Sequence, residues 1–379
     1  MDKFTKAAGL LQVHGIDGWL IACNEDSDIH STYFLGLKSH ARHFILVDAN
    51  GDHQIIAVEM EAPMIQKAID EMNASVAVRA FKSNDEMIEF LKEMLAKPRI
   101  AVNYGEDSLQ QPTAQADYIK AGELQSLRAI APDTKFISAI DLILEMRAQK
   151  TPEELDALRE SVKITLEILE DIPNWVTIGM TEREVMAKLH YEYFKIGEPS
   201  FEAIVGSCEN SADPHHNSSD RKISHGAFLV DTGLRRNQMS SDITWTYWIG
   251  GTPPGEFLDA YHVLMEAKKI ANKYMTAGGI TTVPDEKCRE YLAEMGYDHK
   301  KLFNHGLGHA LGYETHDIGP RASSSAAPKN AIFPENAVYT NEPGLYWQGK
   351  WGIRLEDDII ITNGDCEQVS YNHEDPIVF

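Results

Sequence analysis

The stretch 227–249, AFLVDTGLRRNQMSSDITWTYWI, decides the fold of the C-terminal part of this 379-residue chain. Two apolar runs flank a short polar connection, a pattern that predicts an antiparallel β-hairpin. A turn centred on Arg236 and Asn237 would place Asp231 opposite Asp242. Because opposed side chains in such a ladder lie about 4.5–5.5 Å apart, the stretch predicts two neighbouring carboxylates on one sheet face.

A second stretch, 336–362, NAVYTNEPGLYWQGKWGIRLEDDIIIT, has the same organisation. A turn centred on Gly349 would place Glu342 opposite Glu356, and a slip of one residue would move one of them to the other face. Four converging carboxylates would repel by roughly 4 kcal/mol per pair at an effective dielectric near 20, more in total than a typical folding stability. Bound cations or protons would remove this repulsion. From the spacing alone, solvated sheet faces with screened charges remain the alternative.

Histidines supply the next indication. The glycine-rich stretch 303–317, FNHGLGHALGYETHD, contains His305, His309 and His316. Carboxylates combined with one or two imidazoles suit Mn, Co, Fe or Zn better than a thiolate site would. The four cysteines form no CxxC pair and the sequence has no HExxH motif, so neither a zinc-thiolate site nor a helical zinc-protease site is predicted.

The remainder of the chain predicts two domains. Before residue 150, strand-like runs at 18–22, 43–51, 53–60 and 99–105 alternate with helical patterns, which is typical of a small α/β domain. Long helices are predicted after the capping boxes at Thr151 and Thr181, and a third over 254–275. We therefore expect an α+β chain with an α/β domain over 1–145 and a catalytic domain over 146–379, in which helices cover a curved antiparallel sheet.

The charge balance limits the partners. The chain has 35 Lys and Arg against 58 Asp and Glu, a formal net charge of −23, which disfavours nucleic acid and anionic membranes. Its N-terminal residues lack the features of a signal peptide, and no apolar run reaches the roughly 18 residues that a membrane helix needs. We expect no nucleic-acid or membrane partner, and a cytoplasmic location.

Five motifs resemble a known family. VDTG, SSDITWT, HGLGHALG, TNEPGLY and GIRLEDD follow one another as in the signature of the pita-bread metallopeptidases, which include prolidase, aminopeptidase P and methionine aminopeptidase. The resemblance implies two divalent metal ions per chain, Mn, Co, Fe or Zn, with Asp242 and Glu356 bridging them. The implied ligands are Asp231, Asp242, His309, Glu342 and Glu356.

The resemblance extends to the first domain. STYFLG at 31–36 is similar to the creatinase-type N-terminal domain, and MRAQKTPEEL at 146–155 resembles the linker into the catalytic domain. Methionine aminopeptidases lack this first domain, so the likeness favours the branch of prolidase, aminopeptidase P and creatinase. Within it the chain looks most like an Xaa-Pro dipeptidase (prolidase), which implies hydrolysis of the bond before proline in a small peptide. A homodimer is the corresponding expectation.

Several other residues match the family's substrate side. ADPHHNSSDRKI at 212–223 is similar to a substrate-side histidine loop, which assigns His215 by position and leaves its neighbour His216 open. His316 matches a second histidine near the scissile bond. Arg321 falls near an arginine that holds the substrate carboxylate, although its spacing from His316 is one residue longer here. His305 is expected to contact the substrate.

The proposed chemistry leaves alternatives open. Glu342 is expected to carry a proton from the attacking water to the leaving nitrogen, while Arg354 and Asp357 are expected to support the metal site. The alternatives are an Xaa-Pro aminopeptidase acting on longer peptides, metal-free hydrolysis of a guanidino compound, another hydrolase or lyase, and a metal-free module that binds a basic partner. Metal analysis separates the metal-dependent peptidase from the metal-free binding module.

Overall fold

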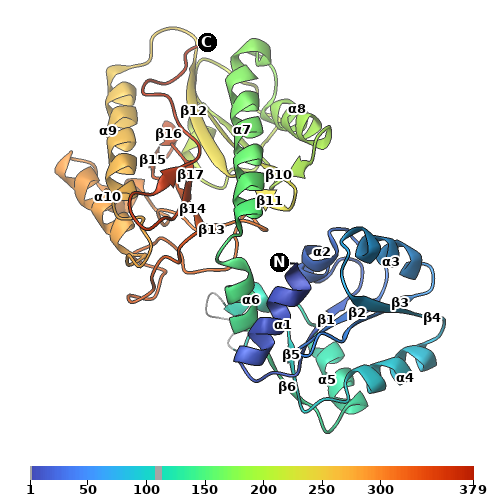
Figure 1. Ribbon diagram of the computed structural model, residues 1–379. Coiled ribbons are helices and arrows are strands. Elements are labelled where there is room, and N and C mark those ends of the chain that lie inside the picture. The colour runs from blue at the N-terminus through green and yellow to red at the C-terminus, as the bar shows by residue number, and fades with distance from the viewer. Residues whose placement is uncertain (1, 107–112) are drawn as a thin grey trace. The chain divides into compact units, whose positions relative to one another are not determined.

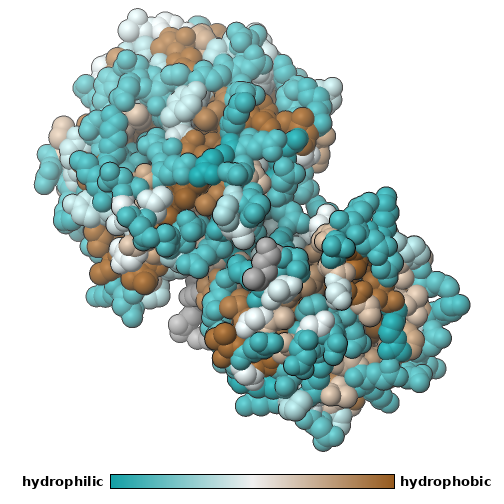
Figure 2. All heavy atoms as spheres, in the orientation of Figure 1, coloured by the Kyte–Doolittle hydropathy of each residue, from teal (hydrophilic) through white to brown (hydrophobic). Residues whose placement is uncertain are grey.

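The computed structural model describes residues 2–106 and 113–379 (Figure 1). The contacts within the chain divide it into two compact units, with the boundary between Met146 and Arg147. In the described part of the chain, we find no helix with the length and hydrophobicity that a bilayer crossing requires. On the face shown in Figure 2, hydrophilic residues cover most of the surface and hydrophobic residues form separate patches.

The first unit is built on a mixed sheet with the strand order β4-β3-β2-β1-β5-β6. β1 is buried along its whole length, as expected for an apolar strand in the middle of a covered sheet. The strands are β1 (Gly18–Cys23), β2 (His43–Asp48), β3 (His53–Val58), β4 (Val76–Phe81), β5 (Arg99–Val102) and β6 (Lys135–Ser138). The helices are α1 (Lys3–Val13), α2 (Ile29–Leu35), α3 (Ala62–Glu71), α4 (Asn84–Met94), η1 (Thr113–Ala116), α5 (Ala121–Ile130) and α6 (Ile140–Arg147).

The first two long helices of the second unit, α7 and α8, begin where the sequence predicts. α7 starts after Thr151, whose side chain accepts from the Glu154 amide while Glu154 accepts from the Thr151 amide. The same capping box, formed by Thr181 and Glu184, opens α8. The helices are α7 (Pro152–Trp175), α8 (Glu182–Phe194), η2 (Cys208–Ala212), α9 (Gly255–Asn272), α10 (Val283–Glu294) and α11 (His299–Leu302).

The antiparallel strands of the second unit are divided among several short ladders. Their orders are β11-β10-β7, β12-β9-β8, β13-β14-β17-β18 and β15-β16. The strands are β7 (Glu198–Pro199), β8 (Ile204–Ser207), β9 (Gly226–Thr232), β10 (Leu234–Arg236), β11 (Met239–Ser240), β12 (Ile243–Ile249), β13 (Ala310–Leu311), β14 (Val338–Asn341), β15 (Gly344–Trp347), β16 (Trp351–Arg354), β17 (Asp357–Ile360) and β18 (Glu367–Gln368).

The predicted register of the first hairpin is wrong by two residues. β9 and β12 pair so that Asp231 lies opposite Thr244, not Asp242. The cause is the turn, which is centred on Asn237 and Gln238, both with positive φ, as in the type I′ turns that match strand twist. Because an offset of two residues preserves the sheet face, Asp231 and Asp242 still line the same cavity.

The predicted register of the second hairpin is confirmed. Gly344 pairs with Arg354 and Asn341 pairs with Asp357, so the same register continues on both sides of Glu342 and Glu356. These two glutamates lie at the interruption between the β15-β16 ladder and the β14-β17 ladder. Pro343 stands at this interruption and has no amide hydrogen to donate.

Candidate metal centre

All the predicted metal ligands line one cavity of about 300 Å³ in the second unit. They come from the ends of β9, β12 and β14, from the junction of β16 and β17, and from the segment before β13. The cavity lining also includes the predicted substrate-side residues His215, His305, His316 and Arg321. Residues from 215 to 356 in the sequence therefore meet at one place.

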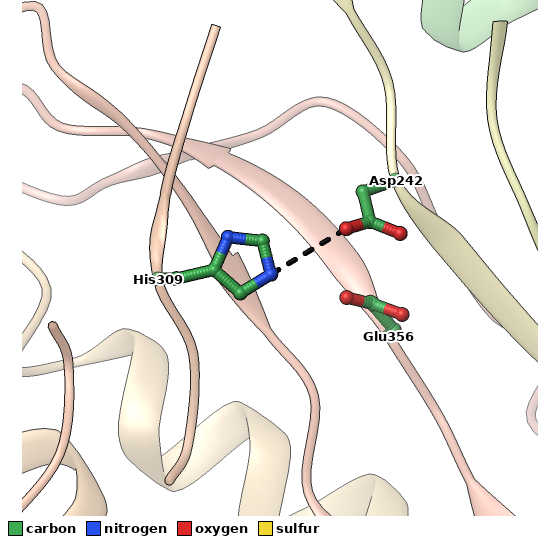
Figure 3. A group of neighbouring side chains, drawn as sticks. All are labelled: Asp242, His309 and Glu356. Atoms are coloured by element: carbon green, nitrogen blue, oxygen red, sulfur yellow. Dashed lines mark ion pairs between the residues drawn. The ribbon is translucent and has the colours of Figure 1, made fainter. Parts of the chain in front are cut away.

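Three side chains form the tightest cluster of candidate ligands. One ligand atom from each of Asp242, His309 and Glu356 lies within 4.8 Å of the others. Figure 3 shows these side chains pointing toward one another, with His309 Nε2 3.5 Å from Asp242 Oδ2. His309 Nδ1 is 3.1 Å from the carbonyl oxygen of Ala310, and because a carbonyl only accepts, this nitrogen is the donor. Nε2 therefore presents its lone pair to the carboxylates, as in a metal-binding histidine.

Glu342 and Asp231 complete the acidic lining. Glu342 Oε1 lies 3.6 Å from His309 Nε2, and Glu342 Oε2 lies 3.7 Å from His305 Nδ1. Arg354 Nη2 donates to Asp231 Oδ2, but the buried Asp231 Oδ1 has no hydrogen-bond partner among the residues that the structure describes. A buried carboxylate oxygen without a partner, beside the cluster described above, fits a bound cation.

The electrostatics show that the acidic cluster is under-compensated by the protein. Burial, followed by the neighbouring Glu356, raises the pKa of Asp242 well above its usual value. Burial and Glu342 do the same to the pKa of Glu356. Burial raises the pKa of Glu342 to about 8, and burial together with His316 lowers the pKa of His309 well below its usual value. A divalent cation binds to a neutral imidazole and to ionised carboxylates. Its positive charge would compensate the repulsion between these carboxylates.

Arg354 orients two of the carboxylates. Besides Asp231, its guanidinium donates to Thr244 Oγ1 at 2.9 Å and to the carbonyl oxygen of Pro214 at 3.1 Å. Thr244 Oγ1 in turn donates to Glu356 Oε2 at 2.6 Å. This geometry agrees with the expectation that Arg354 supports the site.

The comparison with known proteins establishes the family. Residues 156–363 match metallopeptidase family M24. The chain belongs to this family. The predicted resemblance to the pita-bread metallopeptidases is therefore confirmed, and the metallopeptidase works with divalent metal ions.

Named relatives of this metallopeptidase span its whole length. The chain is 27% identical to the Xaa-Pro dipeptidase of Pyrococcus furiosus over 372 residues, 97% of each chain. Its structure is similar to the X-Pro aminopeptidase of Thermotoga maritima, with a TM-score of 0.85, 28% identity and full coverage of both chains. It is also similar to the prolidase of Pyrococcus horikoshii, with a TM-score of 0.81, 27% identity and 98% of each chain covered. The predicted α+β pita-bread fold, with a domain before the catalytic domain, is confirmed.

The structure separates the two adjacent histidines of the metallopeptidase. His215 lines the cavity. His216 Nε2 lies 2.8 Å from Glu182 Oε2, and Glu182 is fully buried and also accepts from Ser207 and Ser219. Position in the motif and geometry therefore both favour His215 as the cavity residue.

Two polar residues beside the site were missed by sequence reasoning. The fully buried Asp358 accepts the Asp242 amide at 3.1 Å, and its spacing of two from Glu356 along a strand was the available signal. Lys268 on α9 is buried and forms an ion pair with Asp357 at 2.5 Å. A lysine in an amphipathic helix gives no such signal, because most lysines there are solvated.

Proposed function

We propose that this metallopeptidase hydrolyses the peptide bond before proline in Xaa-Pro dipeptides. The observation that carries the proposal is the meeting of four carboxylates and one imidazole in a single cavity that is also lined by His215, His316 and Arg321. The Xaa-Pro dipeptidase of Pyrococcus furiosus and the prolidase of Pyrococcus horikoshii, both similar to the chain over nearly its whole length, support the choice of substrate.

Two divalent ions, Mn, Co, Fe or Zn, are proposed for the cavity. The residues that would hold them are Asp231, Asp242, His309, Glu342 and Glu356, all of which line the cavity. Such ions lower the pKa of a water molecule and polarise the scissile carbonyl. The oxygen-rich donor set with one imidazole suits these metals.

Glu342 is proposed to carry the proton from the attacking water to the leaving nitrogen. Its carboxylate faces the cavity, and Thr340 Oγ1 donates to Oε1 at 3.4 Å. A carboxylate in the cavity lining can take a proton from the water and return it to the leaving nitrogen, because it is within reach of a group bound in the cavity.

The histidines and Arg321 are proposed to hold the peptide. Burial lowers the pKa of His316, so its ring is neutral and offers one N–H to the developing oxyanion. His215 would take the matching position on the other wall of the cavity. His305 Nδ1 donates to the Gly306 carbonyl at 2.8 Å and Nε2 accepts from Tyr346 at 2.9 Å, so we propose that its ring, and not a free nitrogen, contacts the substrate. Arg321 would pair with the free carboxylate of a dipeptide.

Domains and assembly are part of the same proposal. Residues 1–145 would form the creatinase-like N-terminal domain and 146–379 the catalytic domain, and the enzyme would act as a cytoplasmic homodimer. The chain's division after Met146 and the full-length similarity to the relatives support these boundaries.

The substrate is tested with matched peptides and purified, metal-loaded enzyme. Gly-Pro and Met-Pro should be cleaved and Gly-Leu should not, and metal analysis should find two ions per chain. Cleavage of Gly-Leu at a similar rate would contradict the proline requirement. The second candidate is an Xaa-Pro aminopeptidase, which the similarity to the Thermotoga maritima enzyme favours; faster cleavage of Xaa-Pro-Xaa than of Xaa-Pro would select it.

A further inference from the structure

The segment 312–318 carries His316 to the metal cavity. The His316 ring packs edge-on against His309, with the ring centroids 4.2 Å apart and an interplanar angle of 84°. Thr315, which also lines the cavity, donates from Oγ1 to the carbonyl oxygen of Ser200 at 3.0 Å. The position of His316 relative to the cavity therefore depends on what holds this segment.

Asp317, the residue after His316, closes the segment on itself. Its side chain is fully buried. Oδ2 accepts from the Tyr313 amide at 3.1 Å and Oδ1 accepts from the Ile318 amide at 2.8 Å, so one carboxylate holds both ends of 313–318. A buried carboxylate needs further compensation for its charge.

Two cations from the start of the second unit provide that compensation. Arg147 Nη2 donates to Asp317 Oδ1, and Lys150 Nζ donates to Asp317 Oδ2 at 3.0 Å. Arg147 also donates to Glu314 at 2.7 Å, and Lys150 donates to the Arg147 carbonyl at 2.6 Å. Two cations and two carboxylates balance, and each oxygen of Asp317 accepts two hydrogen bonds, so the carboxylate at the centre of the cluster is fully satisfied.

The network also fills the space beside the backbone of the segment. A Cβ added at Gly312 would lie 2.4 Å from Asp317 Oδ2 and 2.4 Å from Lys150 Cε. Since such contacts are impossible without movement, any side chain at 312 must displace the network or the segment.

We propose that Arg147, Lys150 and Asp317 are positioning residues that hold the 313–318 segment so that His316 faces the scissile bond. The proposal rests on the role given to His316 in the proposed function. Arg147, Lys150 and Asp317 are not among the described residues that line the cavity. They act by fixing the backbone on both sides of His316, as the outer partners of a metal ligand fix its orientation.

The first test is Lys150→Met, which removes one cation and leaves the Arg147–Asp317 pair. We expect kcat/KM for Gly-Pro to fall about 10-fold, with metal content unchanged and with faster hydrogen exchange of the amides in 313–318. Lys150→Arg should restore most of the activity. Lys163→Met is the matched control, because Lys163 lies nearby on α7 and its side chain is 76% exposed. This substitution should change neither kcat/KM nor hydrogen exchange in 313–318.

A double-mutant cycle separates positioning from general stabilisation. In a His316→Ala background, Lys150→Met should cause no further loss of kcat/KM if it acts through His316. If the double variant instead loses kcat/KM by the product of the two single losses, the proposal is overturned. Should Lys150→Met fail to fold, Gly312→Ala displaces the same network without changing its charge, and Gly364→Ala, with open space around its Cβ, is its control.

Hydrogen exchange keeps the test independent of the substrate. If the wild-type enzyme does not cleave Gly-Pro, the proposed function fails, but loosened exchange in 313–318 in the metal-loaded variants would still support the anchoring. If exchange in this segment is the same in Lys150→Met, Gly312→Ala and wild type, the anchoring fails even where hydrolysis is normal.

Discussion

The second unit contains two buried acidic clusters with opposite electrostatics. At Asp317, Arg147 and Lys150 outweigh the effect of burial and hold the pKa of the carboxyl below its usual value. At Asp242 and Glu356, burial and mutual repulsion raise the pKa of both carboxyls well above the usual value. The protein's own cations neutralise the cluster at Asp317. The cluster at Asp242 and Glu356 lacks enough positive charge from the protein. The difference separates a structural role from a functional one.

The largest expected effect comes from removing a carboxylate of the uncompensated cluster. Asp242→Asn should lower hydrolysis by at least about 10³-fold, because the bound ions contribute several kcal/mol to the transition state. The same change removes a buried like charge, so the metal-free variant should be more stable than the metal-free wild type. Metal analysis, peptide hydrolysis and urea denaturation measure these effects. Asp259→Asn on the exposed face of α9 is the control, and retained turnover in Asp242→Asn would remove the distinction between the clusters.

The compensated cluster should respond in the reverse direction. Asp317→Asn leaves the buried Lys150 without its carboxylate and leaves Arg147 with Glu314 alone, and breaking a buried pair in this way costs about 3–5 kcal/mol. The free energy of unfolding in urea should fall by this amount whether or not metal is present. A loss below about 1 kcal/mol would mean that the cluster is not held by its charges.

The pH dependence of stability should also differ between the clusters. The pKa of Glu342 rises from an ordinary 4.5 to about 8 in the folded protein. Its contribution to the free energy of unfolding is therefore fully present below pH 4.5 and is lost as the pH rises through 8. The pKa of Asp317 is lowered in the folded protein, so its contribution to the free energy of unfolding is lost as the pH falls.

The wild type and Glu342→Gln are compared by urea denaturation from pH 4.5 to 8 with the metal chelated. The wild type should lose roughly 2–4 kcal/mol relative to the variant over this range. Parallel pH profiles for the two proteins would show that Glu342 stays ionised. Added Mn²⁺ should restore the free energy of unfolding that the wild type loses at pH 8.

The smallest effect concerns a neighbour of the ligands. Thr244→Val preserves the shape of the side chain but removes the hydroxyl that donates to Glu356 and accepts from Arg354. Metal affinity should fall about 10-fold with kcat at saturating metal nearly unchanged, as for other outer partners of metal ligands. Isothermal titration with Mn²⁺ gives the affinity; an unchanged value would show that Glu356 needs no orienting partner.

The sequence predicted much of the fold because local signals were strong. The capping boxes at Thr151 and Thr181 fix helix starts through bonds within four residues, and the structure contains both. The first hairpin register was wrong because positive φ at Asn237 and Gln238 moved the turn by one position, and no residue there is a glycine that would have indicated it.

The remainder of the site depended on contacts that no pattern encodes. Arg147 ends α6 and Lys150 follows it, and residues of these types are usually solvated. Both are buried here and pair with Asp317, which lies 167 residues beyond Lys150. Lys268 is similar, since its partner Asp357 lies on a distant strand.

The sequence by itself determined the types of candidate ligand, their order and the family to which the chain belongs, because side-chain chemistry and motif spacing are properties of the chain. Tertiary structure alone decided which charges are paired and which are left for a cation. Desolvation and Coulomb interactions depend on distances between elements far apart in sequence, and these distances exist only in the folded protein.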